Sequence, residues 1–233
     1  MIESLQVTSV TAERSGGDDI FDCFARSLRR RHGLMWPYAH AFLERAFPER
    51  VVRDVVNLAW PATDLHGVSG RRELHNEQRR YFNTDAVSHV VAAFELADTF
   101  QGRAMIRLLR NELGIDLSGT YLRIEYCQDV DGFWLEPHTD IGVKRLTLQL
   151  YLSGEAGQQD LGTDIYADAT TRVSRAPFGK NKAMLFIPTE HTWHGFERRP
   201  ICGIRKSLII NYVTQEWRSR EQLAFPDEPV SAL

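Results

Sequence analysis

Cysteine is scarce in this sequence. Only three occur in 233 residues, at Cys23, Cys127 and Cys202. Their number is odd, their spacings are irregular and no Cys-X-X-Cys pair is present, which argues against a disulfide framework and a cysteine zinc site. We interpret all three as reduced thiols, and we expect a cytoplasmic protein.

Long hydrophobic runs are missing as well. No stretch of about 18 apolar residues occurs, so no membrane span or membrane partner is expected. Residues 1–9 lack the basic start and apolar centre of a signal peptide.

A strong excess of charge of one sign is the third absence. Lys and Arg number 28 and Asp and Glu number 31, for a net charge of −3. This balance argues against a nucleic-acid partner. Basic clusters occur at 29–31, 71–72 and 79–80, and we interpret them as solvated helix and loop faces.

The remaining composition is that of a globular chain. The hydrophobic share is 43% and the charged share is 25%, and the length suits a single domain spanning 1–233. No internal repeat is evident.

The first half of the chain is predicted to be rich in helices. The expected elements are a short strand at 4–11, helices at 20–31 and 37–46, an element of undecided type at 49–58, and a helical region at 84–113. Asp18 or Asp19 is the expected N-cap of the first of these helices, and Gly114 the expected C-cap of the last. The loop-rich stretch 61–80 holds His66 and His75, which we interpret as surface histidines.

Two apolar stripes mark core-packing helix faces between residues 84 and 114. Their members are Val87, Val90, Val91 and Phe94 in one stripe and Ile106, Leu109 and Leu113 in the other.

From residue 120 the hydrophobic period changes from 3.6 to 2, which indicates strands. Strands are expected at 121–127, 144–153, 163–166, 183–188 and 207–213, with a turn at 129–132. In the clearest of them, Leu146, Leu148, Leu150 and Leu152 share one face, and Arg145, Thr147, Gln149 and Tyr151 share the other. The leucine face needs cover from the helices, whereas the polar face suits a ligand-lined cavity.

This order of elements predicts a mainly β, α+β fold. It fits a jelly roll buttressed by helices, the double-stranded β-helix barrel that is shared with cupins. We expect a helix-rich buttress at 1–115, the β core at 116–215 and a surface tail at 216–233.

A candidate metal site is visible in two short motifs. His138 and Asp140 are two residues apart just before a strong strand pattern, so their side chains point to one side. Trp193-His194-Gly195 offers a second imidazole downstream. Two histidines and one carboxylate form the facial triad of non-haem Fe(II) oxygenases. His191 is the rival third ligand, and the absence of cysteine favours Fe(II) over zinc.

A second pattern follows the triad. Arg205 and Ser207 lie on one face of a predicted strand, and the rigid fork of an arginine suits a carboxylate.

With these motifs in place, the chain resembles the Fe(II)- and 2-oxoglutarate-dependent oxygenase superfamily, most of all its prolyl-hydroxylase-like branch. The resemblance covers about residues 120–214. In chain order its elements are Tyr126, His138-Thr139-Asp140, Tyr151-Leu152-Ser153, His194 and Arg205-Lys206-Ser207.

The resemblance implies roles for these residues. His138, Asp140 and His194 would bind Fe(II) as the catalytic centre, with 2-oxoglutarate and O2 as co-substrates. Arg205, Ser207 and Tyr151 would bind the distal carboxylate of 2-oxoglutarate, and Tyr126 would contact its keto-acid end. Family halogenases replace the carboxylate ligand with a small residue, so Asp140 implies hydroxylation or a related oxidation.

The substrate is less defined by the sequence. Two departures from the prolyl-hydroxylase pattern, Leu161-Gly162-Thr163-Asp164 and the longer interval from His194 to Arg205, argue against peptidyl proline. We expect oxidation of a small polar metabolite, with a peptidyl or protein hydroxylase as one alternative and a non-catalytic cupin-like binding protein as another. The candidate substrate contacts are Arg123, Glu125, Trp134, Asp164 and Trp193.

Overall fold

The computed structural model describes residues 19–62, 70, 79–140 and 142–232. The strand predicted at 4–11, together with His66 and His75, lies outside the described residues.

Helices and strands both occur in the first half of the described chain, and strands dominate the second. The helices are α1 (Ile20–Arg29), α2 (Glu49–Val56), α3 (Thr84–His89), α4 (Val91–Gln101), α5 (Arg103–Leu113) and the short 3-10 helix η2 (Arg220–Gln222). The strands are β1 (His32–Leu34), β2 (His40–Glu44), β3 (Arg80–Tyr81), β4 (Tyr121–Asp129), β5 (Leu135–His138), β6 (Lys144–Tyr151), β7 (Asp164–Tyr166), β8 (Arg172–Arg175), β9 (Lys182–Phe186), β10 (His194–Phe196) and β11 (Arg205–Val213). Among the described residues no helix is long and apolar enough to span a bilayer.

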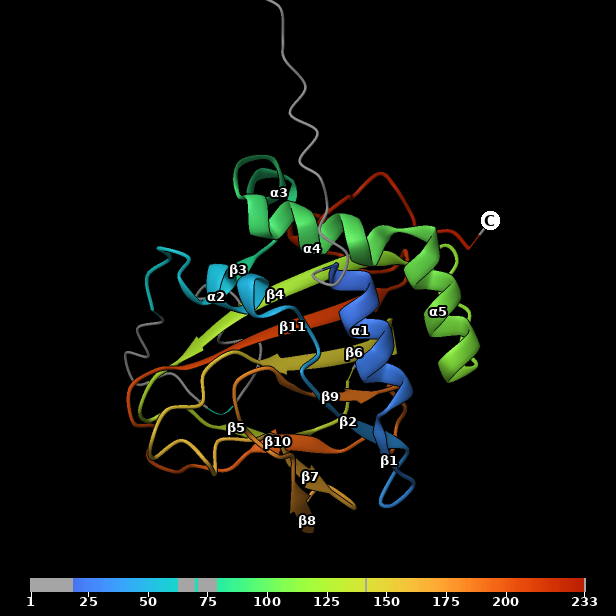
Figure 1. Ribbon diagram of the computed structural model, residues 1–233. Coiled ribbons are helices and arrows are strands. Elements are labelled where there is room, and N and C mark those ends of the chain that lie inside the picture. The colour runs from blue at the N-terminus through green and yellow to red at the C-terminus, as the bar shows by residue number, and fades with distance from the viewer. Residues whose placement is uncertain (1–18, 63–69, 71–78, 141, 233) are drawn as a thin grey trace, which may run out of the picture.

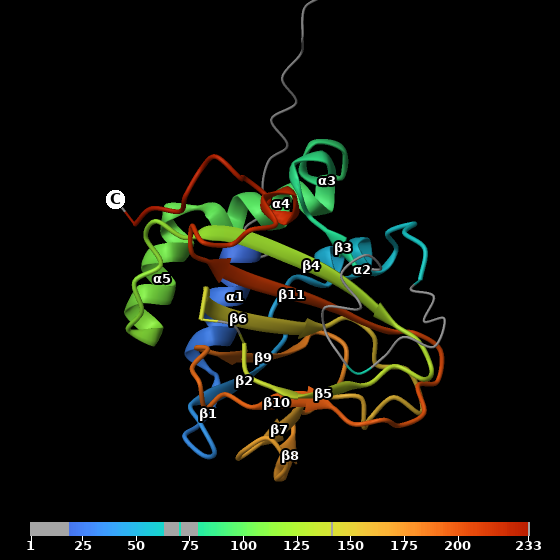
Figure 2. The ribbon, with the colours of Figure 1, turned by 180° about the vertical axis from the view of Figure 1, so that it is seen from behind.

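The strands form two antiparallel sheets that lie one over the other (Figures 1 and 2). The larger has seven strands in the order β1-β2-β9-β6-β11-β4-β3, and the smaller has four in the order β5-β10-β7-β8. Helices α1, α4 and α5 cover the outer face of the large sheet, and the small sheet lies on its other side (Figure 1). This two-sheet arrangement agrees with the jelly-roll expectation.

Two hydrophobic clusters hold these layers together. The first lies between the helices and the large sheet and contains Leu146, Leu148, Leu150 and Leu152, so the predicted leucine face is covered by helices. The second lies between the two sheets and includes Tyr151 and Phe196. The predicted polar face of β6 therefore faces the space between the sheets.

Two helix ends follow local capping rules. The Asp19 side chain accepts a hydrogen bond from the backbone of Phe21 at the start of α1. Gly114 ends α5 in the left-handed conformation, with φ 69°. The element of undecided type at 49–58 is helix α2.

The prediction of a helix at 37–46 is wrong. This segment contains strand β2, which pairs with β1 on one side and with β9 on the other. Ala41 and Leu43 enter the first cluster, whereas Phe42 packs against the second, so tertiary pairing overrides the local helical pattern. Since β1, β2 and β3 all join the large sheet, the first half of the chain is not a purely helical buttress.

One of the two predicted helix stripes is also corrected. Val90 takes an extended conformation between α3 and α4, which resets the phase of the helix. Val91 and Phe94 are therefore exposed, and α4 instead buries Leu96 and Phe100.

A bulge changes one position on the polar face of β6. Tyr212 pairs with Leu146 and Val213 pairs with Lys144, so Arg145 is an extra residue in the ladder. Arg145 is exposed, contrary to expectation, and Lys144 is buried. The bulge thus places an ammonium group rather than a guanidinium between the sheets.

Candidate metal centre and its two cavities

His138 and His194 face each other across the β5–β10 ladder, where they are register partners. Their ring centroids are 4.4 Å apart. Gly195 permits this close approach, because a Cβ there would lie 2.8 Å from the carbonyl oxygen of Leu135. A glycine is therefore required at this position of the Trp-His-Gly motif by the close packing of β10 against β5.

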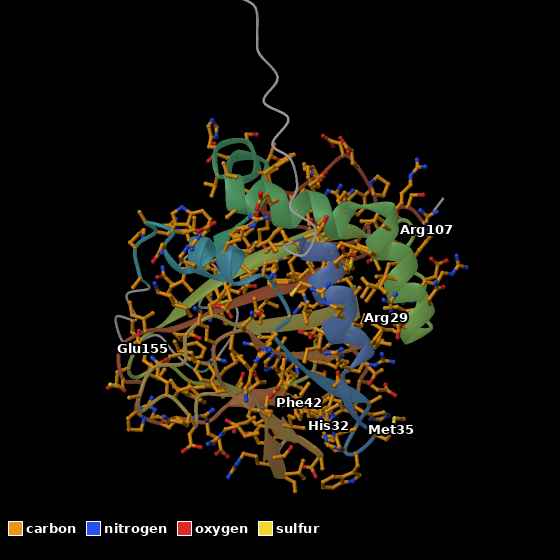
Figure 3. The ribbon with its side chains drawn as sticks, viewed as in Figure 1. Arg29, His32, Met35, Phe42, Arg107 and Glu155 are labelled. Atoms are coloured by element: carbon orange, nitrogen blue, oxygen red, sulfur yellow. The ribbon has the colours of Figure 1, made fainter. Side chains whose placement is uncertain are left out.

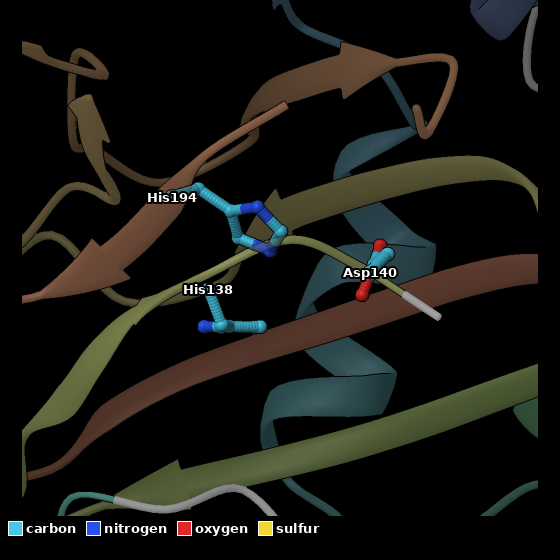
Figure 4. Close-up of side chains that lie close together, drawn as sticks. All are labelled: His138, Asp140 and His194. Atoms are coloured by element: carbon cyan, nitrogen blue, oxygen red, sulfur yellow. The ribbon is translucent and has the colours of Figure 1, made fainter. Parts of the chain in front are cut away.

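Asp140 completes a cluster with the two imidazoles (Figure 4). It follows β5 by two residues, and one potential ligand atom from each side chain lies within 4.8 Å of the others. The Nδ1 atom of His138 lies 2.9 Å from the carbonyl of Glu136, and that of His194 lies 2.8 Å from the carbonyl of Thr192. With the proton on Nδ1, each ring presents the Nε2 lone pair as a ligand.

The rival ligand His191 lies apart from this cluster. Its side chain is 78% exposed and contacts Glu190. Of the histidines described, His138 and His194 are the two that the structure gathers with a carboxylate into one possible metal-binding group of three side chains.

The carboxylate of Asp140 is held by two buried donors. Lys144 forms an ion pair with Oδ1, and the hydroxyl of Thr147 donates to Oδ2 at 2.8 Å. Asn211 donates in turn to the Thr147 hydroxyl at 2.9 Å. Such outer partners orient a ligand and tune its affinity for metal. Neither Lys144 nor Asn211 was anticipated from the sequence.

A narrow inner cavity of about 60 Å³ extends from the triad into the space between the sheets. Arg205, Ser207, Gln149 and Thr163 line it. The Ser207 hydroxyl is fully buried and has no hydrogen-bond partner among the described residues. A buried donor without a partner is costly, which indicates a site for an acceptor from a bound molecule.

The far end of the inner cavity is charged. Asp129 accepts a hydrogen bond from Arg205 at 2.5 Å and forms an ion pair with Arg79 at 3.0 Å. Glu125 forms an ion pair with Arg123 at 2.7 Å. Arg79 and Arg205 line the inner cavity together with Asp129 and Glu125, so its two guanidinium groups are balanced by two carboxylates.

Arg79 was interpreted from the sequence as part of a solvated basic cluster, and that interpretation is wrong for this residue. Its side chain is 10% exposed and lines the inner cavity. Burial alone would lower its pKa, but the neighbouring carboxylates of Asp129 and Glu125 and the Cys127 thiol raise it above the ordinary value.

The two tyrosines assigned to 2-oxoglutarate lie in different places. Tyr126 points to the opposite face of β4, into the first hydrophobic cluster beside Trp60, so it does not line the cavity. Tyr151 is the register partner of Ser207, but its hydroxyl donates to Thr163 at 2.9 Å. Thr163 therefore occupies the position on the cavity wall that the sequence suggested for Tyr151.

A larger outer chamber of about 570 Å³ opens on the other side of the triad. Leu135, Val143 and Trp217 supply its apolar walls. Part of the wall is the segment 216–222 of the tail, which the sequence had suggested to be a surface wrapping. Leu135, His138 and Asp140 line both cavities, so the triad stands at their junction.

Arg123 ties the tail to the metal centre. Its guanidinium lies 4.8 Å from the Tyr81 ring and 4.8 Å from the Trp217 ring. It donates to Gln222 at 2.8 Å and to Asn211 at 3.3 Å, and Asn211 leads to Asp140 through Thr147.

Of the five candidate substrate contacts, Arg123 lines the outer chamber and Glu125 lines the inner cavity. Trp134, Asp164 and Trp193 line neither. Asp164 is fully buried in ion pairs with Arg175 and Arg199, so its role is structural. Position along the chain alone did not separate these residues.

Solved structures match this arrangement over most of the chain. A prolyl 4-hydroxylase from Phytophthora capsici has a TM-score of 0.56 at 12% identity, covering 90% of this chain and 70% of its own. A Pseudomonas putida prolyl-4-hydroxylase has a TM-score of 0.54 at 12% identity, covering 82% of this chain and 99% of its own. A Burkholderia pseudomallei oxidoreductase of the 2OG-Fe(II) oxygenase family has a TM-score of 0.52 at 11% identity, covering 83% and 89%.

The fold is that of the 2-oxoglutarate- and iron-dependent oxygenases. No family model matches the sequence, and no curated protein sequence does.

The residues present fit both groups that this oxygenase fold accommodates. Two imidazoles and a carboxylate without a thiolate are the donor set of Fe(II) in such enzymes. The unpartnered Ser207 hydroxyl beside Arg205 is suited to one carboxylate of 2-oxoglutarate.

Proposed function

We propose that this protein is an Fe(II)- and 2-oxoglutarate-dependent dioxygenase that hydroxylates an unactivated C–H bond of a small polar metabolite. In this reaction 2-oxoglutarate is converted to succinate and CO2. The supporting observation is the position of the triad, because Leu135, His138 and Asp140 line both the inner cavity and the outer chamber. Co-substrate and substrate would thus approach one metal ion from two sides.

Each part of the site has a task in this proposal. Bound Fe(II) and 2-oxoglutarate supply, with O2, the oxidising power that breaks the C–H bond. His138, Asp140 and His194 would hold the Fe(II) ion. Arg205 and Ser207 bind the distal carboxylate and so fix the direction of the co-substrate.

The groups around the triad keep this geometry. Lys144 and Thr147 orient the carboxylate of Asp140, and the carbonyls of Glu136 and Thr192 orient the imidazoles.

The shape of the outer chamber supports a small substrate. Its volume of about 570 Å³ falls in the ordinary range for small-molecule sites. The tail segment 216–222 forms one wall, and Arg123 holds Trp217 in place. Lys144, Ser219 and Gln222 add polar groups to the apolar wall, as recognition of a polar metabolite requires.

The test is anaerobic addition of Fe(II) and then 2-oxoglutarate, followed by visible absorption. We expect a weak charge-transfer band that requires both additions, and succinate release once air and substrate are admitted. The band should be absent from Arg205→Ala and present in Arg198→Ala, which removes an exposed arginine over Trp134.

Metal binding by Arg205→Ala, measured by calorimetry, shows that this variant is folded. If the wild-type protein binds Fe(II) tightly and never gives the band, the proposal is wrong and a cupin-like metal-binding role takes its place. Succinate release that is stimulated only by peptides would overturn the assignment of a small metabolite.

A further inference from the structure

A surface concavity of about 730 Å³ lies where the second half of α1 meets the β1–β2 ribbon. One side is formed by Cys23, Arg26 and Ser27 of α1 and by Arg30, the residue that caps the end of this helix. The other side includes His32, Phe42, Glu44 and Arg45. None of the residues that line it lines either cavity of the metal centre.

The concavity concentrates positive charge in a protein whose net charge is −3. Arg26, Arg30 and Arg45 are exposed, and none of them forms an ion pair with another described residue. The one acid in the wall, Glu44, is 3.5 Å from the ammonium of Lys182. Within the described part of the chain, three guanidinium groups therefore share one hollow and none of them forms an ion pair with a carboxylate.

The neighbours of Arg30 in the sequence behave differently. Arg29 and Arg31 both form ion pairs with Glu112 on α5, at 3.4 Å and 3.1 Å. The run 29–31 is therefore split, and only its central residue enters the concavity. Figure 3 shows Arg29 on the side of α1 toward α5, whereas His32 and Phe42 lie below the end of that helix.

The walls of the concavity are built from regular elements. The Ser27 hydroxyl donates to the carbonyl of Glu44 at 2.8 Å, and the Cys23 thiol donates to that of Arg45 at 3.4 Å, which fixes α1 against the end of β2. His32 and Phe42 are register partners across β1 and β2. Arg45 has φ 50°, an uncommon backbone conformation for a residue other than glycine.

We propose that this concavity binds a small anion that carries two or more phosphate groups. Guanidinium groups match phosphate oxygens with paired hydrogen bonds, and three of them exceed the needs of a single carboxylate. The half-buried ring of Phe42 beside them offers a stacking surface for the organic part of a phosphate ester. This site does not depend on the proposed oxygenase activity.

The test is calorimetric titration of the full chain with inorganic pyrophosphate at low salt. We expect saturable binding of one pyrophosphate that weakens with added salt, and that weakens about tenfold in Arg30→Gln and in Arg45→Gln. Arg29→Gln removes the same charge one residue away, outside the concavity, and should bind as the wild type does.

A parallel titration with ADP distinguishes the two sources of phosphate. Tighter binding of ADP than of pyrophosphate, with the difference lost in Phe42→Leu, assigns the site to an organic phosphate, whereas equal binding assigns it to inorganic polyphosphate. The proposal is overturned if pyrophosphate does not saturate the protein, or if Arg26→Gln/Arg30→Gln binds it unchanged. Binding of a long RNA that pyrophosphate does not displace would also overturn it.

Discussion

Arg205 and Asp129 are register partners across β11 and β4 and form a buried ion pair. Their side chains are 4% and 2% exposed, and the second oxygen of Asp129 is 3.0 Å from Arg79. The arginine that is suited to the distal carboxylate of 2-oxoglutarate thus already has an internal carboxylate partner. This cluster fills the end of an inner cavity of only about 60 Å³, so a bound dicarboxylate would compete with Asp129 for Arg205.

The first prediction concerns Asp129→Asn. Removal of the carboxylate leaves two buried guanidinium groups without their shared partner, so the free energy of unfolding should fall by about 3 kcal/mol. The same change removes the internal competitor, so the affinity for 2-oxoglutarate should rise. Urea unfolding with and without 2-oxoglutarate measures both effects, since a ligand stabilises the folded state according to its affinity.

Asp160→Asn is the matched control for Asp129, because Asp160 is 89% exposed and lies 3.9 Å from its nearest arginine. Asp160→Asn should change neither the free energy of unfolding nor the affinity for 2-oxoglutarate. If 2-oxoglutarate stabilises Asp129→Asn less than it stabilises the wild type, Asp129 assists binding and the competition inferred here is wrong.

Ser207→Ala should separate stability from binding. The hydroxyl is buried without a partner among the described residues, so its removal should leave the free energy of unfolding unchanged or raise it by up to about 1 kcal/mol. The affinity for 2-oxoglutarate should fall about fivefold, as expected for one lost hydrogen bond. Ser153→Ala is the control with the opposite expectation. Ser153 accepts a hydrogen bond from the backbone of Lys206 at 3.0 Å, so its removal should lower the free energy of unfolding and leave the affinity for 2-oxoglutarate unchanged. Equal affinity in Ser207→Ala and the wild type would remove Ser207 from the co-substrate site.

The two histidines near residue 192 should differ in their response to metal. Fe(II) at about 100 times its Kd should stabilise the wild type by about 2.7 kcal/mol under anaerobic conditions. His194→Ala should lose this effect because the triad loses an imidazole, whereas His191→Ala should keep it because that side chain is 78% exposed and outside the cluster. Thermal unfolding with and without Fe(II) makes the comparison. Loss of the effect in His191→Ala would reverse the ligand assignment.

Cys127 should make the protein less stable at alkaline pH. Burial raises the pKa of its thiol from 9.0 to about 12, opposed by Arg79 and supported by Glu125 and Asp129. Between these values the unfolded chain releases the proton and the folded chain keeps it. The contribution is therefore complete below pH 9 and is lost toward pH 12, by about 1.4 kcal/mol per pH unit.

In Cys127→Ala the free energy of unfolding should fall less steeply with pH, by about 1.4 kcal/mol per pH unit. Urea unfolding at pH 8, 9 and 10 measures this slope. The slope of stability with pH is the observable, because the substitution also removes buried volume. Cys202→Ala changes an exposed thiol and should keep the wild-type slope. An identical slope in Cys127→Ala would show that the thiol does not carry the effect.

Local patterns predicted the parts of the fold whose causes are local. Asp19 and Gly114 terminate helices by capping alone, and the leucines of β6 alternate because one face is apolar. The segment 37–46 was predicted wrongly because its local pattern suits a helix. Pairing with β1 and β9 makes it a strand. An interruption at Val90 and a bulge at Arg145 each shifted a predicted face by disturbing the period.

The site shows the same division. Residue type and order along the chain were sufficient to select His138, Asp140, His194 and Arg205, because each has a chemistry that few other residues supply. The parity of one strand decided against Tyr126, which lies on β4 between Glu125 and Cys127 but points to the opposite side of the sheet.

The sequence by itself determined the donor set, the arginine and serine downstream of it and the alternation of the strand that borders the cavity. Those features depend on chemical identity and on spacing along one strand. Only the tertiary structure decided that Arg79 and Asp129 share the space around Arg205, that Arg123 links the tail to Asp140, and that Arg45 lines the same concavity as Arg26 and Arg30. These contacts join residues far apart in the chain, and the packing of sheets and helices, which no local pattern encodes, brings them together.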